Sequence, residues 1–203
     1  MDGRASRIAL GRLDLAPAAG VDDADARAAR WFDAAVILAM ALVVVAGRAP
    51  YFDTFDGMGK DGPLYVNALK LDATFDVPMP GNIGYVLLGK LANVFWTEPV
   101  TAFLAVNVGL TIVGAAFAYL FGTLVVSRPL AAVAALAMTC NPMVWWHGGA
   151  IASYPVWLAV LPAVGWYGLR YQRSGRAADM VGASVALGAG MILRPDLLAF
   201  GTP

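Results

Sequence analysis

The stretch PVTAFLAVNVGLTIVGAAFAYLFGTLVVS, residues 99–127, contains no charged side chain. A helix needs roughly 20 apolar residues to cross a hydrocarbon core about 30 Å thick, and this stretch exceeds that length. Inside lipid the backbone has no water to bond to, and a helix satisfies its own backbone groups within one segment. We therefore expect residues 99–127 to form a transmembrane helix, the second span of the chain.

The composition of the whole chain supports an integral membrane protein. Hydrophobic residues make up 60% of the sequence and charged residues 14%, and the mean hydropathy is +0.67. Soluble domains have roughly 45–50% apolar and about 25% charged residues. A formal net charge of zero argues against a nucleic-acid partner. The lone Cys140 excludes an internal disulfide, and the lone His147 excludes a multi-histidine metal cluster.

Further apolar segments predict about five spans in an all-α fold. Residues 31–47 form the first, with Trp31 at the interface where aromatic side chains gather. Residues 129–169 carry no charge and are too long for one crossing, so the chain must reverse within them. The polar run Thr139-Cys140-Asn141-Pro142 and the Trp145-Trp146-His147 turn are predicted to supply the reversal. This gives spans at about 130–146 and 150–169, and residues 177–193 form the fifth.

Two polar regions flank the first span. Residues 1–30 mix both signs of charge, and we expect a solvated cytoplasmic tail. Residues 48–98 form a loop, and its part from Arg48 to Phe95 contains five of the fourteen acidic residues, namely Asp53, Asp56, Asp61, Asp72 and Asp76. Asp61 and Asn82 are predicted to cap two short helices, 62–73 and 84–96, which lie in the membrane interface because neither is long enough to span.

Lysine and arginine counts predict the orientation. With the N-terminus inside, the cytoplasmic segments carry nine of these residues and the outer segments five. In membrane proteins the cytoplasmic loops are richer in lysine and arginine than the outer loops. We therefore expect a multi-pass protein of the inner (plasma) membrane with a cytoplasmic N-terminus. The acidic loop, the turn containing His147, and Arg194 then all lie on the outer face. Carboxylates, an imidazole and a guanidinium that converge beside a bilayer suit chemistry on a lipid-linked phosphate.

These residues carry a resemblance to a known superfamily. The run Asp61-Gly62-Pro63-Leu64-Tyr65 resembles the D-E-x-x-Y type motif that follows the first span of GT-C fold membrane glycosyltransferases. The segment from Pro80 to Leu88 is similar to the protein mannosyltransferase and aminoarabinose transferase branch, as are Asn141-Pro142-Met143-Val144-Trp145 and Leu193-Arg194-Pro195-Asp196. The resemblance covers residues 31–203, which would be the N-terminal part of such a membrane domain. Gly62 replaces an acidic residue of the pattern, and no His precedes the Pro-Gly run.

The resemblance implies a hexosyl- or pentosyltransferase that uses a polyprenyl-phosphate sugar donor. Asp61 would be the general base that deprotonates an acceptor hydroxyl, with Asp53 and Asp56 as further catalytic candidates. Lys60, Tyr65, His147 and Arg194 would bind substrate, the cations facing the phosphate leaving group. A divalent metal ion is left open as a cofactor, and no other cofactor is implied.

Each of these residues also has a purely structural interpretation. Asp61 could be only a helix cap, Asp53 and Asp56 only solvated, and His147 part of an interfacial aromatic belt. Arg194 could pair with Asp196 or extend its charge to the surface.

Two questions stay open at the level of sequence. Enzymes of this type have more spans, so we expect an N-terminal fragment, a truncated product, or half of a split enzyme with a C-terminal continuation or partner subunit. The alternative function is a non-catalytic membrane subunit or small transporter component. Glycines in the spans favour close helix packing within the bundle or against a partner. The absence of ionisable residues in the second to fourth spans argues against transport.

Overall fold

The computed structural model describes residues 23–51, 62–69 and 82–197, and within these ranges every regular element is a helix. The α-helices are α1 (Asp23–Arg48), α2 (Gly62–Ala68), α3 (Ile83–Asn93), α4 (Pro99–Thr123), α5 (Arg128–Thr139), α6 (Pro142–Gly149), α7 (Pro155–Ser174) and α8 (Ala177–Leu193). Two short 3₁₀ helices, η1 (Ala49–Tyr51) and η3 (Pro195–Leu197), follow α1 and α8.

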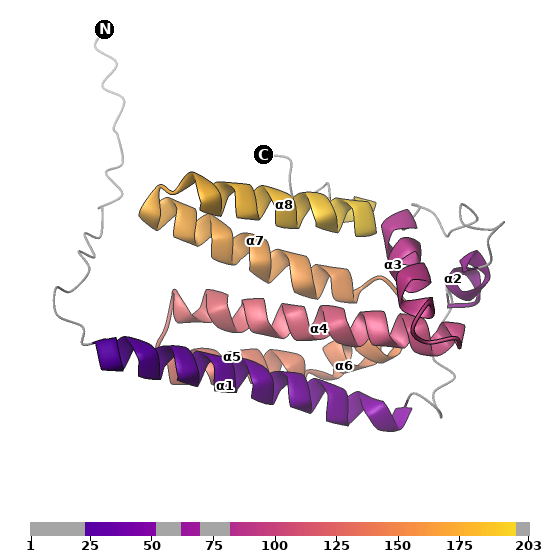
Figure 1. Ribbon diagram of the computed structural model, residues 1–203, viewed down its shortest axis with the longest axis horizontal. Helices are drawn as coiled ribbons and strands as arrows, with labels where there is room; N and C mark the ends of the chain where they lie inside the picture. The colour runs from indigo at the N-terminus through magenta and orange to yellow at the C-terminus, as the bar shows by residue number, and fades with distance from the viewer. Residues whose placement is uncertain (1–22, 52–61, 70–81, 198–203) are drawn as a thin grey trace, which may run out of the picture.

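Helix α4 is the centre of the bundle. It packs against α7 on one side and against α1 and α5 on the other, and α8 packs on the outside of α7 (Figure 1). The long helices run roughly side by side, and α3 lies across one end, where it contacts both α4 and α8. The end of α1, helix α6, the start of α7 and the end of α8 all lie at this α3 end of the bundle.

The protein is a helical membrane protein by the length and composition of its helices. Residues Ala24–Arg48 of α1 and all of α4 are each long and apolar enough to cross a bilayer. Helices α5 and α6 meet at a 55° bend and add a third span if they cross as one unit. Helix α8 is apolar but shorter. The described residues thus contain two or three of the five predicted spans by this criterion.

Several helix starts agree with the sequence predictions, whereas most helix ends differ. Helix α8 has the predicted bounds, α2 begins at the predicted residue but ends at Ala68 instead of 73, and α3 begins one residue early and ends at Asn93 instead of 96. Helix α1 begins at Asp23, eight residues before the predicted start at Trp31. The charged residues in its first turns are compatible with a helix that extends beyond its apolar part.

The predicted reversal between the third and fourth spans was placed wrongly. Trp145, Trp146 and His147 lie inside helix α6 and do not form a turn. Asn141 accepts a hydrogen bond from the Met143 N–H at 2.9 Å, and Pro142 occupies the first turn, so the run starts a new helix. The chain bends there, and it reverses in the non-helical residues 150–154.

Local caps explain where the central helix begins and where α7 ends. The Glu98 carboxylate accepts a hydrogen bond from the Thr101 N–H at 2.5 Å, and Pro99 follows in the first turn of α4. Partial burial acts to raise the pKa of Glu98, but hydrogen bonds from Thr101 and Val100 outweigh it and lower the pKa overall. Gly175 ends α7 with φ of 64°, a left-handed conformation that glycine adopts without strain.

The short helices α2 and α3 contribute an aromatic core. Tyr65 and Tyr85 are almost fully buried and their rings pack edge to face at 5.0 Å, while Phe103 of α4 stacks on Tyr85 at 5.1 Å. The Asn82 side chain was predicted to cap α3 but makes no capping bond. It donates to the Tyr65 hydroxyl instead, because both groups are buried and each needs a partner.

Several span glycines allow close helix contacts inside the chain. A Cβ at Gly114 would lie 2.5 Å from the Leu158 carbonyl oxygen, so α4 and α7 pack directly on this glycine. Gly84 approaches the Ile192 backbone in the same way and brings α3 against α8. Gly109 and Gly188 have open space where a Cβ would be, so they are not needed for packing within the bundle.

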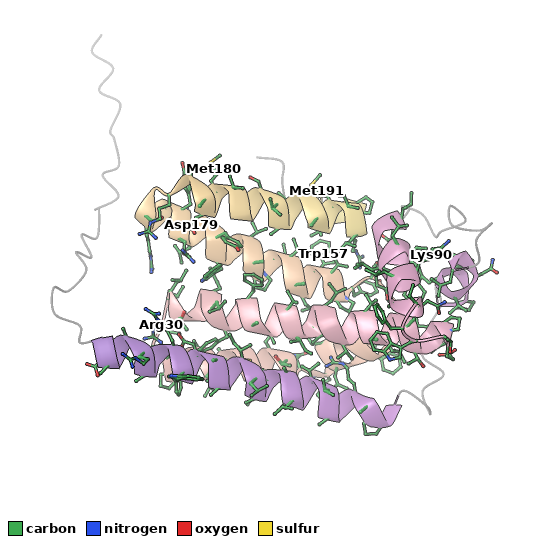
Figure 2. All side chains as sticks on the ribbon, in the orientation of Figure 1. Arg30, Lys90, Trp157, Asp179, Met180 and Met191 are labelled. Atoms are coloured by element: carbon green, nitrogen blue, oxygen red, sulfur yellow. The ribbon has the colours of Figure 1, made fainter. Side chains whose placement is uncertain are left out.

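Two carboxylates at the opposite end of the bundle from α3 are paired with arginines. Asp33 accepts hydrogen bonds from the Tyr119 hydroxyl and from Arg128 Nε at 3.0 Å. Asp179, which is buried, pairs with Arg170 Nε at 3.1 Å across the turn between α7 and α8. Figure 2 shows Arg30 and Asp179 at this end and Lys90 at the other. These contacts hold the helix ends together. Helix packing therefore explains the carboxylates of Asp33 and Asp179, and no functional role is needed for them.

Candidate functional site

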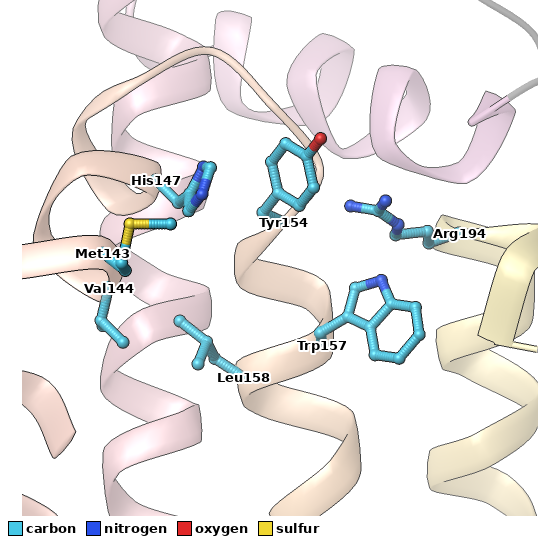
Figure 3. Close-up of a pocket in the computed structure, with 7 residues that line it drawn as sticks. All are labelled: Met143, Val144, His147, Tyr154, Trp157, Leu158 and Arg194. Carbon is cyan, nitrogen blue, oxygen red and sulfur yellow. The ribbon is translucent and has the colours of Figure 1, made fainter. Parts of the chain in front are cut away.

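A cleft of about 280 Å³ lies at the α3 end of the bundle, between α6, the start of α7 and the end of α8. Figure 3 shows the side chains around it. It is lined by Met143, Val144, His147, Tyr154, Trp157, Leu158 and Arg194. The lining combines apolar and aromatic surface with one guanidinium and one imidazole. Ligand pockets in proteins commonly have this composition, with a few polar groups fixing the orientation of a mostly apolar site.

Arg194 is held firmly at the edge of the cleft. It follows α8 in extended conformation, and its Nε lies 2.9 Å from both carboxylate oxygens of Asp196. Its guanidinium lies over the Tyr154 ring, 4.4 Å from the centroid, and 5.6 Å from that of Trp157. Stacking and the ion pair together fix the plane of the guanidinium. Of the two structural interpretations that the sequence left open for Arg194, the ion pair with Asp196 is the one the structure contains.

One nitrogen of Arg194 keeps its hydrogen-bonding capacity. The Nη1 atom is buried and has no hydrogen-bond partner among the described residues. The whole side chain is only 15% exposed. Because a buried donor without a partner costs free energy, this nitrogen favours an acceptor that enters the cleft. An oxyanion would satisfy both the donor and the charge of the guanidinium.

His147 reaches the same cleft from α6. Its ring lies 4.3 Å from the Tyr154 ring, and Tyr154 stands between His147 and Arg194 (Figure 3). The structure therefore brings together two of the residues predicted from sequence, which are 47 positions apart in the chain. Chemically, the cleft can bind a ligand that has an anionic group beside a ring or other planar apolar surface.

The other predicted residues do not join this cleft in the described part of the chain. Tyr65 is 2% exposed, accepts a hydrogen bond from Asn82, and lies in the aromatic core, so it supports the fold at this position. Its role in substrate binding stays a prediction. The four remaining predicted residues, Asp53, Asp56, Lys60 and Asp61, lie outside the described residues. Among the described residues no group of three or more His, Cys, Asp or Glu side chains could hold a metal ion.

Sequence reasoning missed the two aromatic residues that shape the cleft. Tyr154 and Trp157 are three positions apart at the start of α7, which puts both on one face of the helix. That spacing is a signal for a shared aromatic face, but nothing in the sequence places Arg194 opposite that face. The pairing depends on how the end of α8 packs on α7.

A buried polar network fixes the turn that connects His147 to Tyr154. Asn107, in the middle of the uncharged helix α4, is fully buried and donates from Nδ2 to the Ala150 carbonyl at 2.6 Å. Its Oδ1 accepts from the Tyr85 hydroxyl at 2.9 Å. Burial raises the pKa of Tyr85 well above its ordinary value, and the nearby Tyr65 adds to this, so the hydroxyl stays protonated and can donate. Asn107 thus links α3, α4 and the reversal between α6 and α7.

No family model, curated protein or solved structure matches this chain. The resemblance to membrane glycosyltransferases therefore stays a prediction from residue pattern. The cleft around Arg194 is the feature of the described residues on which a function can be argued.

Proposed function

We propose that this chain is a membrane glycosyltransferase, or the N-terminal part of one, that transfers a sugar from a polyprenyl-phosphate donor to an acceptor at the outer face of the membrane. The observation that carries the proposal is Arg194, which lines a cleft with aromatic walls and whose buried Nη1 has no hydrogen-bond partner among the described residues. A sugar phosphate has an oxyanion for the guanidinium and a ring for the aromatic surface. The apolar lining suits the lipid-proximal part of such a donor.

In the proposed reaction the acceptor hydroxyl attacks the anomeric carbon of the donor sugar. The new glycosidic C–O bond forms as the bond to the phosphate oxygen breaks, and the lipid phosphate leaves with the electron pair and an added negative charge. Arg194 would stabilise that charge where it develops, assisted by His147 and Lys60. Asp61, or else Asp53 or Asp56, would accept the proton of the attacking hydroxyl as general base, with inversion at the anomeric carbon.

The role of Arg194 has a direct test. Arg194→Gln is expected to lower kcat/KM for the polyprenyl-phosphate sugar about 10–100-fold, because it removes a charge-assisted hydrogen bond worth about 1.5–3 kcal/mol. Arg194→Lys keeps the charge but loses the planar fork and the stacking, and is expected to recover only part of the rate. The measurement is transfer of radiolabelled sugar by the complete chain, with its partner or continuation where one is required.

Arg128→Gln is the matched control for this experiment, because it removes a half-exposed arginine from an ion pair at the opposite end of the bundle. It is expected to keep wild-type transfer. Wild-type kcat/KM in Arg194→Gln would show that the cleft is not part of the donor site.

The proposed orientation places this cleft outside and the N-terminus in the cytoplasm of a plasma membrane. We expect Asp61→Cys and Asp76→Cys to react with a membrane-impermeant maleimide added to intact cells, and Arg173→Cys to react only after the membrane is opened. The variants are made in a Cys140→Ser background, because Cys140 is exposed and would otherwise react itself. The reverse labelling pattern would overturn both the orientation and the outer-face site.

A further inference from the structure

Two polar side chains of the Arg194 cleft lie on either side of one aromatic ring. The guanidinium carbon of Arg194 lies 4.4 Å from the centroid of the Tyr154 ring, and the centroid of the His147 ring lies 4.3 Å from the same point. By the sum of these distances, the guanidinium and the imidazole are at most about 8.7 Å apart. Figure 3 shows Tyr154 between them, so its ring keeps the two groups from meeting.

The Tyr154 ring also prevents a single phosphate from binding both groups. A charge-assisted hydrogen bond joins nitrogen and oxygen at about 2.7–2.9 Å, so a phosphate that bound both would have to lie close to the line between them. The Tyr154 ring lies there (Figure 3). Arg194 has the charge that a phosphate requires, and its buried Nη1 has no hydrogen-bond partner among the described residues. His147 is then left for a different part of the ligand.

The imidazole of His147 suits a hydroxyl group. A neutral imidazole has one nitrogen that donates a hydrogen bond and one that accepts, and a hydroxyl likewise both donates and accepts. His147 lines the cleft and is only partly buried, so its polar edge can meet a ligand there. The two side chains therefore match a ligand that carries a phosphate on one side and a hydroxyl on the other.

A sugar phosphate has this arrangement of polar groups. In a pyranosyl phosphate the phosphate is on C1 and the C4 hydroxyl is on the opposite ring atom. The cleft volume of about 280 Å³ is just below the roughly 300–1,000 Å³ of typical small-molecule pockets, so there is room for one sugar ring with its phosphate. The rest of the lining, Met143, Val144, Trp157 and Leu158, is apolar or aromatic.

We propose that His147 determines which sugar the donor carries. It binds the hydroxyl farthest from the anomeric carbon, on C4 of a hexose or C3 of a pentofuranose, while Arg194 binds the phosphate and Tyr154 separates the two. This role rests on the proposed transferase function and refines it, since His147 contacts the sugar instead of assisting at the leaving phosphate. The donor is a monosaccharide, because a second sugar on that hydroxyl would occupy the place of the imidazole.

The test pairs a change in the protein with a change in the donor. For the complete chain, with its partner or continuation where one is required, kcat/KM is measured with polyprenyl-phosphate esters of glucose, mannose, galactose and arabinofuranose. The best of these is then compared with its analogue that lacks the one hydroxyl. The wild type is expected to prefer the parent donor about 3–10-fold, the effect of one neutral hydrogen bond. His147→Ala is expected to lose this preference and to use both donors as slowly as the wild type uses the deoxy donor.

Arg194→Gln is the matched control on the other side of Tyr154. It is expected to lower kcat/KM for both donors by the same factor and to keep the wild-type preference, because both donors carry the same phosphate. His147→Phe keeps the ring contact with Tyr154 but removes both nitrogens, and is expected to lose the preference as His147→Ala does. It decides the question if His147→Ala has a lowered thermal midpoint.

The outcomes separate this inference from the transferase proposal. If both His147 variants keep the wild-type preference while transfer itself is observed, the inference is overturned and the transferase proposal stands. Equal use of the parent and deoxy donors by the wild type, or transfer of a disaccharide ester as fast as the monosaccharide ester, would also overturn the inference alone. If the wild type transfers none of the four sugars, the transferase proposal fails and the role of His147 fails with it.

Discussion

Asp61→Asn is expected to reduce sugar transfer about 10²–10⁴-fold, the usual loss when a general base is removed. Asp61 immediately precedes α2, which begins at Gly62, so the residue is also in position to cap that helix. Asn caps a helix about as well as Asp but has little power to accept a proton. The thermal midpoint in detergent is therefore expected to stay close to that of the wild type while transfer is lost.

Asp72→Asn is the matched control, because it removes a carboxylate from the same acidic loop that the proposed reaction does not use. It is expected to transfer sugar at the wild-type rate. Full activity in Asp61→Asn would reduce the residue to a helix cap. A large fall in the midpoint with a proportionate fall in activity would make it structural and would move the catalytic assignment to Asp53 or Asp56.

Asn107→Leu is expected to have the largest effect on stability. The substitution removes the acceptor of the buried Tyr85 hydroxyl and the donor to the Ala150 carbonyl. We expect a loss of about 2–4 kcal/mol, since each buried group left without a partner costs about 1–3 kcal/mol and hydrogen bonds between membrane helices reach about 1.7 kcal/mol. The measurement is reversible unfolding in detergent, or the thermal midpoint where unfolding is irreversible.

Thr111→Val provides the comparison on the same helix, one turn away. The Thr111 hydroxyl is buried and donates only to the Asn107 carbonyl oxygen of its own helix at 2.7 Å, so its loss is expected to cost less than about 1 kcal/mol. Equal losses of stability in Asn107→Leu and Thr111→Val would mean that the network between α3, α4 and the turn at residues 150–154 does not stabilise the bundle. Tyr85→Phe removes one of the two Asn107 bonds and is expected to fall between them.

Two arginines at the α3 end of the bundle have buried nitrogens with no hydrogen-bond partner among the described residues. At the far end Asp33 and Asp179 each have a cationic partner, and their charges are accounted for by helix packing. At the α3 end Arg48 and Arg194 each keep a buried nitrogen with no hydrogen-bond partner among the described residues. Arg194 lines the aromatic cleft, whereas Arg48 packs against Val144 and Trp145 of α6.

The sequence by itself determined the class of the protein and the start of several helices. Uncharged stretches predict helices that cross lipid because a charge there is costly, and caps act on residues within one turn, so both signals are local. Asp61-Gly62-Pro63 correctly predicted where α2 begins, and Arg194 correctly marked the end of α8. The Pro142 run was misread because proline both ends one helix and starts the next, and the sequence does not distinguish a 55° bend from a reversal.

Only the tertiary structure decided which polar groups are buried and what they meet. Arg48 was placed at the start of the loop after the first span, but it is buried against α6 and bonds to Val144, 96 residues away. Tyr154 comes between His147 and Arg194 because α7 packs between α6 and α8. The physical reason is that burial and pairing depend on the packing of helices far apart in the chain, whereas helix periodicity and capping depend on neighbours in sequence.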